Sequence, residues 1–191
     1  MCGGVIFPYK KEYKALLDSV YSPEEVAQFE ATGEVRSLFW QRADPVLPVL
    51  IEPDKTGDTA EPTQAAELTI MRWGNRDKTR SLPQTGWARL ESIEEGKWGY
   101  LKPRPAIIPV TFGVEKGKWF EIKKGIAGLV IAKAGEERIY MLTEAADDEF
   151  LSHTRHNRMP VLLDQNDIPW LSGDPSGTTS TIQSTFHLNW G

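Results

Sequence analysis

Apolar and polar positions change over short distances along this chain, which favours short β-strands over long helices. The segment 46–52 contains Pro48, so it is predicted to be an edge strand or the start of one. Polar, turn-forming residues predict a loop at 53–66 and irregular structure at 74–86. Further strands are predicted from alternating or continuous apolar segments at 67–73, 105–112, 118–122, 126–132, 137–142 and 159–163.

A few short segments carry helix signals instead. Ser22 fits an N-cap, Glu25 completes a capping box with it, and Gly33 suits the C-terminal stop, so we predict a helix at 22–33. Three more helical segments are predicted at 88–95, at 143–153 with Thr143 as N-cap, and at 167–173, where a proline begins a turn.

The mixture of many short strands and few short helices predicts an α+β fold. The chain has 191 residues and shows no repeat or heptad, so one domain spanning 1–191 is expected. Its predicted architecture is a curved or barrel-like mixed β-sheet core with short flanking helices.

The composition and the motifs of the chain predict where the protein is located and which cofactors it lacks. No apolar run is long enough to span a bilayer, and no signal peptide is evident, so a cytoplasmic protein is predicted. The single cysteine excludes a disulfide framework within the chain. Metal-ligand spacing, a phosphate loop and a dinucleotide fingerprint are missing from the sequence, so we expect no metal and no cofactor. We also expect a monomer.

The charge balance differs between neighbouring segments. The net charge of −5 argues against a nucleic-acid partner for the chain taken as a whole. Residues 43–67 are acidic, whereas residues 72–104 carry eight basic side chains against four acidic ones. The second segment is either an ordinary solvated face or a basic patch on an acidic protein.

Aromatic residues gather near predicted loops, at Phe39, Trp40, Trp73, Trp87 and Trp98. One interpretation is that they anchor the core and the loops. The other is that, beside basic residues, some of them stack on unpaired bases.

The only cysteine, Cys2, directly follows the initiator methionine. Removal of Met1 would leave an α-amine and a thiol on adjacent carbons, a 1,2-aminothiol that condenses with aldehydes to a thiazolidine. The α-amine has a usual pKa of ~7.7–8.0 and the thiol one of ~8.5, so both are partly nucleophilic at neutral pH. The alternative is that Cys2 is an incidental residue in a frayed chain end.

A reactive cysteine needs a proton shuttle and a carboxylate nearby. His156 and Arg158 come just before a predicted core strand, and Glu115 follows an apolar run in which partial burial would raise its pKa. Each residue also has an ordinary explanation, as a surface histidine, a salt-bridge partner and a turn glutamate.

Several short motifs then occur in a characteristic order. They are Met1-Cys2-Gly3, Met71-Arg72-Trp73-Gly74, Ala88-Arg89-Leu90-Glu91-Ser92, Ile108-Pro109 through Glu115, Ala127-Gly128-Leu129, Leu142-Thr143-Glu144-Ala145 and His156-Asn157-Arg158-Met159-Pro160-Val161. This order resembles the SOS response-associated peptidase (SRAP) family, which shields abasic sites in single-stranded DNA. The resemblance runs from Cys2 to about Trp170.

The resemblance implies covalent crosslinking of abasic sites in single-stranded DNA, by a protein associated with DNA in the cytoplasm. Cys2 would form the thiazolidine, Glu115 would assist proton transfer, and His156 would help open the sugar and form the Schiff base. The same site removes a short N-terminal pro-peptide in some members, so peptidase activity is a further expectation. The residues expected to contact DNA are Trp73, Arg89, Arg158, Thr143, Trp87 and Arg72.

The chain also departs from the family pattern. Gly4 stands in the place of an arginine, Trp87 replaces an asparagine that orients the abasic sugar, and Trp40 replaces another asparagine. Thr111-Phe112 replaces an aspartate-glycine pair. Two alternatives therefore stay open: a non-covalent single-stranded DNA-binding module that has lost crosslinking, and a cysteine hydrolase that uses Cys2, His156 and Glu115.

Overall fold

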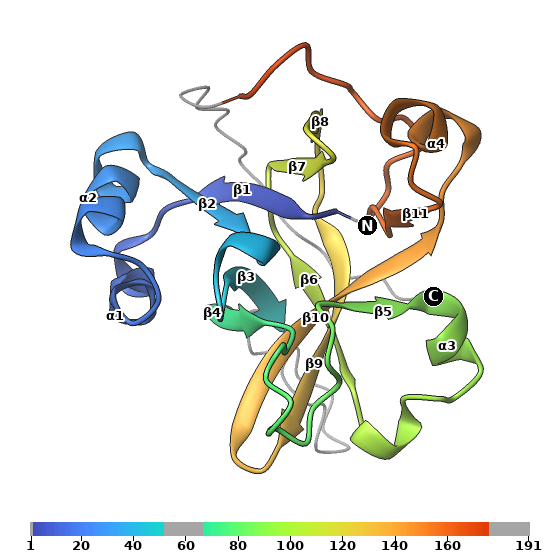
Figure 1. Cartoon of the computed structure of the whole chain (residues 1–191), viewed down its shortest axis with the longest axis horizontal. Helices are drawn as coiled ribbons and strands as arrows, with labels where there is room; N and C mark the ends of the chain where they lie inside the picture. Colours follow the sequence, from blue (N-terminus) through green and yellow to red (C-terminus); the bar gives the residue numbers. More distant parts are fainter. Residues whose placement is uncertain (1, 52–66, 176–191) are drawn as a thin grey trace, which may run out of the picture.

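Five strands close into a mixed β-barrel at the centre of the molecule (Figure 1). In the computed structural model, which describes residues 2–51 and 67–175, each barrel strand is hydrogen-bonded to the next in the order β10–β4–β3–β6–β9, and β9 pairs back onto β10. The predicted α+β single domain with a barrel-like mixed sheet is therefore confirmed. The barrel strands are β3 (Val46–Ile51), β4 (Glu67–Trp73), β6 (Arg104–Ile108), β9 (Ile126–Lys133) and β10 (Glu136–Ala145).

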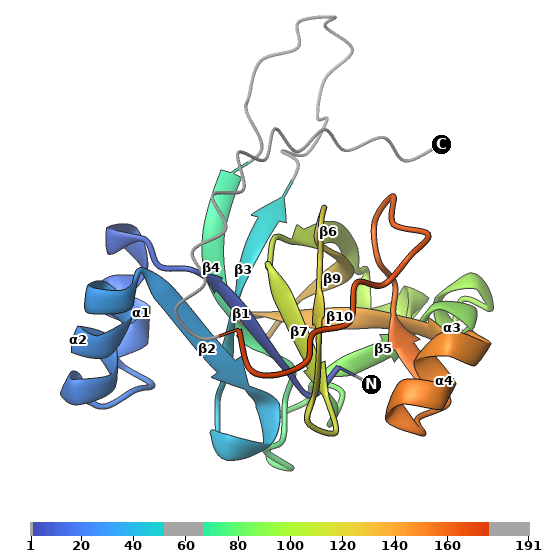
Figure 2. The same cartoon turned by 90° about the horizontal axis from the view of Figure 1, so that it is seen from above.

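A second, antiparallel sheet of four strands lies beside the barrel (Figure 2). Its order is β2–β1–β7–β8, so β1, which begins two residues after Cys2, is an inner strand with partners on both edges. The chain's first strand is thus fixed in a ladder rather than frayed. These strands are β1 (Gly4–Pro8), β2 (Glu34–Leu38), β7 (Phe112–Glu115) and β8 (Lys118–Glu121).

Strand β10 belongs to the barrel and also pairs with two short strands outside it, β5 (Trp87–Arg89) and β11 (Arg158–Pro160). Along one edge it runs parallel first to β4 and then to β5, and along the other it runs antiparallel to β9 and then to β11. Near its end, Thr143 is paired with Arg89 on one side and with Pro160 on the other. Segments far apart in the sequence therefore meet at Thr143.

Short helices cover the outside of the two sheets. Helix α2 confirms its predicted signals: the Ser22 side chain accepts from the Glu25 amide at 3.3 Å, the Glu25 carboxylate accepts from the Ser22 amide at 2.9 Å, and Gly33 ends the helix with φ of 72°. The helices are α1 (Lys14–Asp18), α2 (Pro23–Thr32), α3 (Leu90–Glu94) and α4 (Asp148–Thr154), with 3₁₀ turns η1 (Lys11–Tyr13), η2 (Phe39–Gln41) and η3 (Gly99–Leu101).

The predicted helix at 143–153 begins too early. Thr143 is buried in β10, so it extends the strand instead of capping a helix. The N-cap of α4 is Asp147, whose carboxylate accepts from the Phe150 amide at 2.6 Å. Thr143 adopts the strand conformation rather than a helix cap because it has a ladder partner on each edge.

Three other predictions also needed correction. No helical turn forms at 167–173, because Trp170 makes a β-bridge to Phe120. The apolar segment 105–112 is divided between β6 in the barrel and β7 in the second sheet. Strand β3 is not an edge strand, since β4 and β6 flank it. Strand β6 pairs only with Leu50 and Ile51, so Pro48 has a ladder partner on the β4 side alone. The predicted loop at 53–66 lies outside the described residues.

The core fills the barrel and the space between the sheets. Its largest fully buried side chains include Trp73, Tyr140, Phe7 and Phe120. The buried Arg138 is paired with Asp44 at 2.8 Å, which satisfies its charge at one end of the barrel. Across residues 2–51 and 67–175 there is no helix long and apolar enough to cross a membrane.

Candidate functional site

The main chain around Cys2 is held by three hydrogen bonds from three different elements. The Gly3 amide donates to the Val114 carbonyl at 2.9 Å, and the Phe39 amide donates to the Gly3 carbonyl at 3.0 Å. The indole Nε1 of Trp87 donates to the carbonyl of Cys2 at 3.2 Å. Cys2 is therefore fixed in place, which argues against the interpretation as a frayed end.

The thiol of Cys2 points into the protein. Its Sγ donates to the Gly4 carbonyl at 3.0 Å, and the residue is fully buried. A Cβ on Gly113 would stand 3.1 Å from this Sγ and 2.5 Å from the Phe120 ring, so only glycine leaves room for the thiol. Burial is the main reason that the pKa of the thiol rises to about 12, and the nearby charge of Glu115 raises it further. In this conformation the sulfur is protonated.

Glu115 lies on the same side of the second sheet as Cys2. It is the last residue of β7, and only 7% of it is exposed. Its Oε2 is 3.9 Å from the position that a Cβ on Gly3 would occupy. The predicted carboxylate is thus adjacent to the main chain that follows Cys2.

The surroundings of Gly4 leave no room for a side chain. A Cβ at this position would stand 2.2 Å from Leu38, 3.0 Å from Val114 and 3.1 Å from the carbonyl of Ser37. Because β1 is paired on both edges here, the strand has no room to shift. An arginine does not fit at this position of the chain.

The second group of predicted residues comes from the segment after α4. Arg155 has φ of 52°, which turns the chain at the end of the helix. His156 then donates its amide to the Thr154 hydroxyl at 3.2 Å and accepts the Arg158 amide on Nδ1 at 3.1 Å. The same Nδ1 lies 3.2 Å from the Arg158 carbonyl, so this ring nitrogen faces both main-chain polar groups of Arg158.

Arg158 is held by two neighbours. Its Nη1 and Nη2 donate to the two carboxylate oxygens of Glu91 on α3, at 2.7 and 2.9 Å, and Nη2 also donates to the Thr143 carbonyl. The hydrogen bonds from Arg158 are the main reason that the pKa of Glu91 falls to about 2. Thr143 Oγ1 bonds to the Ala88 carbonyl at 3.3 Å, so this threonine is engaged inside the fold.

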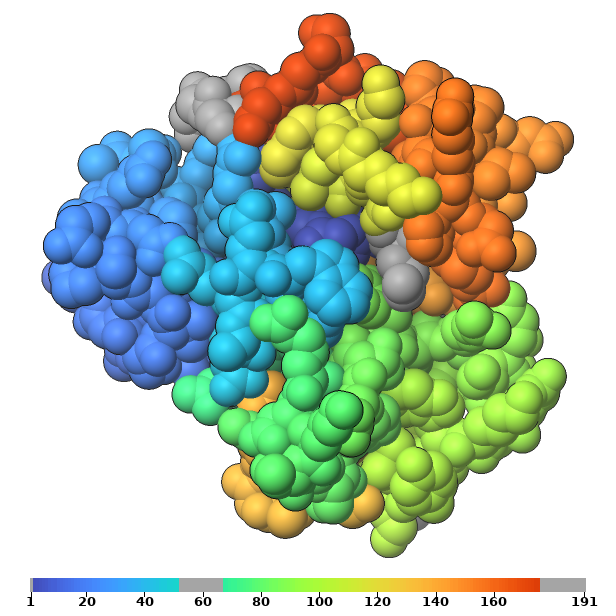
Figure 3. Space-filling view, viewed as in Figure 1, coloured from blue at the N-terminus to red at the C-terminus, as the bar shows by residue number. Residues whose placement is uncertain are grey.

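A hydrogen bond from Lys116 links the group around Cys2 to the segment after α4. The Nζ of Lys116, in the turn after Glu115, donates to the carbonyl of Arg155, next to His156, at 3.2 Å. In the space-filling view, the N-terminal segment lies at the bottom of a hollow bordered by η2, the β7–β8 turn and the segment around β5 (Figure 3). Cys2, Glu115, His156 and Arg158 therefore come from the boundary between the two sheets.

Four of the five aromatic residues named from the sequence form one cluster under this region, whereas Trp98 packs against Tyr140. The Trp87 ring contacts Phe39 at 4.5 Å, Trp73 at 5.6 Å and Trp40 at 5.7 Å between centroids. Trp73 is 1% exposed and Trp87 is 6% exposed, so neither presents a ring face to solvent. Trp87 instead holds the Cys2 carbonyl, whereas Trp40 is exposed.

The remaining predicted DNA contacts differ in position. Arg89 is exposed at the junction of β5 and α3, beside Thr143 in the ladder. Arg72 belongs to another group of charges, because its Nη1 lies 3.5 Å from the Asp44 carboxylate, which also pairs with the buried Arg138. Arg72 thus stabilises the barrel end.

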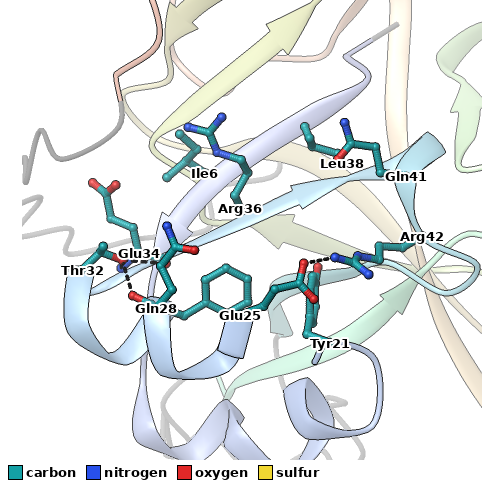
Figure 4. A pocket seen from close by; sticks show the side chains of 11 residues that line it. Ile6, Tyr21, Glu25, Gln28, Thr32, Glu34, Arg36, Leu38, Gln41 and Arg42 are labelled. Carbon is teal, nitrogen blue, oxygen red and sulfur yellow. Dashed lines mark hydrogen bonds and ion pairs between the residues drawn. The ribbon is translucent and has the colours of Figure 1, made fainter. Parts of the chain in front are cut away.

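A cavity of about 200 Å³ lies elsewhere, between α2 and β2 (Figure 4). Its lining includes Tyr21, Gln28 and Arg36, together with the ion pair between Glu25 and Arg42. None of the predicted site residues lines this cavity.

Sequence reasoning missed two residues that shape the site. Glu91 lies in the segment Ala88-Arg89-Leu90-Glu91-Ser92, but only the folded chain shows that its carboxylate accepts hydrogen bonds from Arg158. Gly113 lies in a strand-like run, and nothing in that pattern reveals that the thiol of Cys2 packs against it.

Comparison with known proteins adds no identification. No family model matches the chain, no curated protein matches it, and no solved structure matches it. Within the described part of the chain, no group of three or more His, Cys, Asp or Glu side chains could hold a metal ion. The case for a function therefore rests on the site itself and on the resemblance in the motifs.

Proposed function

We propose that this protein captures abasic sites in single-stranded DNA covalently, through a thiazolidine formed by Cys2 once Met1 has been removed. The observation that carries the proposal is the fixed Cys2 main chain with the buried Glu115 carboxylate beside it, Oε2 lying 3.9 Å from the Cβ position of Gly3. An incidental terminal cysteine has no need of three main-chain anchors around it.

The proposed reaction begins with the α-amine, because an amine needs no thiolate. Its nitrogen attacks the aldehyde carbon of the ring-opened sugar, and two N–H protons pass to the former carbonyl oxygen, which leaves as water. The sulfur then adds to the imine carbon, and the C=N electron pair moves to nitrogen, which takes up the thiol proton. One water is lost overall.

Glu115 and His156 have separate roles in this scheme. Glu115, beside the terminal main chain, carries protons between the amine nitrogen and the departing oxygen. His156 exchanges a proton with the sugar through Nε2, because its Nδ1 faces the amide and the carbonyl of Arg158. The sulfur must leave the Gly4 carbonyl before ring closure, so bond rotation at Cys2 precedes the second step.

The DNA strand would be held by positive charge. Arg89 is exposed and pairs with Thr143 in the ladder. Arg158 also contacts Thr143, and its Nη atoms donate to the Glu91 carboxylate. A guanidinium that holds a carboxylate with two hydrogen bonds can hold a phosphate in the same way. Both arginines are therefore proposed to contact the backbone.

The test uses protein whose intact mass shows that Cys2 is the first residue. It is mixed with single-stranded DNA that carries one abasic site, and the mass is measured after denaturation. The expected product equals the sum of the two masses minus one water. Cys2→Ser is the matched control, because it keeps the amine but cannot close a thiazolidine, and it should yield no adduct that survives heating. A stable adduct with Cys2→Ser, or none with the wild type, would refute the proposal.

One observation favours a second candidate, a non-covalent single-stranded DNA-binding module. The thiol is fully buried and its pKa is raised to about 12, which suits a packing residue better than a nucleophile. This candidate predicts binding to intact single strands that weakens steeply with salt, without any adduct. The mass measurement separates the two candidates directly.

A further inference from the structure

Trp40 is the most exposed tryptophan in the described part of the chain. The residue is 65% exposed, whereas Trp73, Trp87 and Trp119 are buried and the two others are partly buried. An exposed tryptophan leaves a large apolar surface in water, and single exposed apolar residues are common enough to need no explanation by themselves. The surroundings of Trp40 are what make it informative.

The exposed ring is held rather than free. It meets the Phe39 ring edge-on, with centroids 5.0 Å apart and planes at 89°, and it meets Trp87 at 5.7 Å and 35°. The Arg76 guanidinium lies 5.8 Å from its centroid, and Arg76 is itself fixed by a hydrogen bond to the Arg42 carbonyl. A ring with fixed neighbours loses little rotational entropy when a ligand covers its open face.

The position of Trp40 relates it to the reactive residue. Trp40 contacts Trp87, and the indole Nε1 of Trp87 donates to the Cys2 carbonyl at 3.2 Å. The η2 turn that carries Trp40 also borders the hollow over the N-terminal segment (Figure 3). A ligand on the exposed ring would therefore be a close neighbour of a group that reacts at Cys2.

We propose that Trp40 is the stacking platform for the nucleobase that flanks the abasic position, and that Arg76 provides a positive charge beside that base. An indole face takes any base by stacking, and a guanidinium next to it suits a polyanionic strand. The site thus selects an aldehyde by the base next to it, although the reacting sugar has no base of its own. This inference rests on the proposed function and names a specificity residue for it.

The experiment measures stacking separately from chemistry. Equilibrium binding is measured with single strands that carry an unreactive tetrahydrofuran analogue of the abasic site, flanked by adenine, by thymine or by a second analogue without a base. For the wild type, the adenine-flanked strand should bind roughly tenfold tighter than the strand without a flanking base. Trp40→Ala should lose this discrimination, and Trp40→Phe should keep part of it, because its ring is smaller.

Tyr100→Ala is the matched control, since Tyr100 is 75% exposed and belongs to η3. It should leave the discrimination by the flanking base unchanged. Equal losses for Trp40→Ala on strands with and without the flanking base, or no loss at all, would overturn the inference.

A second measurement distinguishes failure of the inference from failure of the proposed function. Adduct formation with abasic DNA is compared, for each variant, with adduct formation from acetaldehyde, which has no base. A lower ratio for Trp40→Ala supports the platform, and an unchanged ratio counts against it. If no variant forms an adduct with either aldehyde while base discrimination persists, the covalent function fails and the platform stands.

Discussion

Arg158 donates through both Nη atoms to the two carboxylate oxygens of Glu91, at 2.7 and 2.9 Å. This is the two-pronged geometry with which a guanidinium also binds phosphate. If Arg158 contacts the DNA backbone as proposed, the Glu91 carboxylate occupies the position that a phosphate would take. On that proposal, Glu91 and the phosphate compete for the same guanidinium.

Glu91→Gln should strengthen binding to single-stranded DNA several-fold at low salt. The change removes a negative charge and leaves Arg158 available for phosphate. In the wild type, the displaced Glu91 carboxylate offsets part of the charge that Arg158 brings to the phosphate. The variant should therefore steepen the slope of log affinity against log salt by up to about 0.7. Fluorescence anisotropy over a salt series measures both quantities.

The control for this variant is Glu94→Gln, on the same helix α3. It removes the same charge without touching Arg158, so it should raise the affinity less and leave the slope closer to that of the wild type. If both variants behave alike, or if Glu91→Gln weakens binding, then Glu91 does not compete with phosphate.

The same ion pair should make stability depend on pH in acid. Hydrogen bonds from Arg158 lower the pKa of Glu91 from 4.5 to about 2, so the folded state favours the ionised carboxylate. The stabilisation is complete above pH 4.5 and is lost as the pH falls toward 2. The difference in urea midpoint between wild type and Glu91→Gln should therefore shrink over this range. A difference that stays constant from pH 6 to pH 3 would contradict the assignment.

Cys2 should react slowly with iodoacetamide in the native protein. With its pKa raised from 9.0 to about 12, the thiolate fraction at pH 8 falls about a thousandfold, and burial slows access further. Alkylation followed by intact mass should be at least about a thousandfold slower than in urea. Equal rates in the two conditions would mean that the thiol is open to solvent.

Gly113→Ala should expel the thiol from its pocket. The new methyl group would stand 2.5 Å from the Phe120 ring and 3.1 Å from the Sγ of Cys2. Overpacking of this kind costs about 1–3 kcal/mol of unfolding free energy, and the displaced thiol should alkylate faster. Gly99→Ala is the control, because a Cβ there meets no atom within 4 Å. Equal stability of the two variants would show that the pocket adjusts without cost.

Local signals in the sequence predicted local structure well. Ser22, Glu25 and Gly33 defined helix α2 because caps depend on neighbours a few positions away. Thr143 misled for the opposite reason: its strand partners, Arg89 and Pro160, come from distant segments, and the ladder they form outweighs its preference for a cap. Tertiary pairing decided the boundary between β10 and α4.

In the candidate site, too, the chemistry of single residues could be predicted from the sequence, whereas their tertiary contacts could not. The sequence nominated Cys2, Glu115 and His156 by their chemistry, and the two sheets bring the segments that carry them to one boundary. Burial of the thiol could not be predicted, because it depends on the space that Gly113 leaves. The positions of Trp73 and Trp87 depend on aromatic packing across three segments, which no periodicity reveals.

The boundary between the two sheets has a mechanical consequence. The Cys2 and Glu115 side belongs to the second sheet, and the Thr143 and Arg158 side belongs to strands attached to the barrel. Any relative sliding of the two sheets would change the distance between Cys2 and Arg158, even with both side chains unaltered. The hydrogen bond from the Trp87 indole in β5 to the Cys2 carbonyl crosses this boundary. It therefore couples the position of Cys2 to the strands of the barrel side.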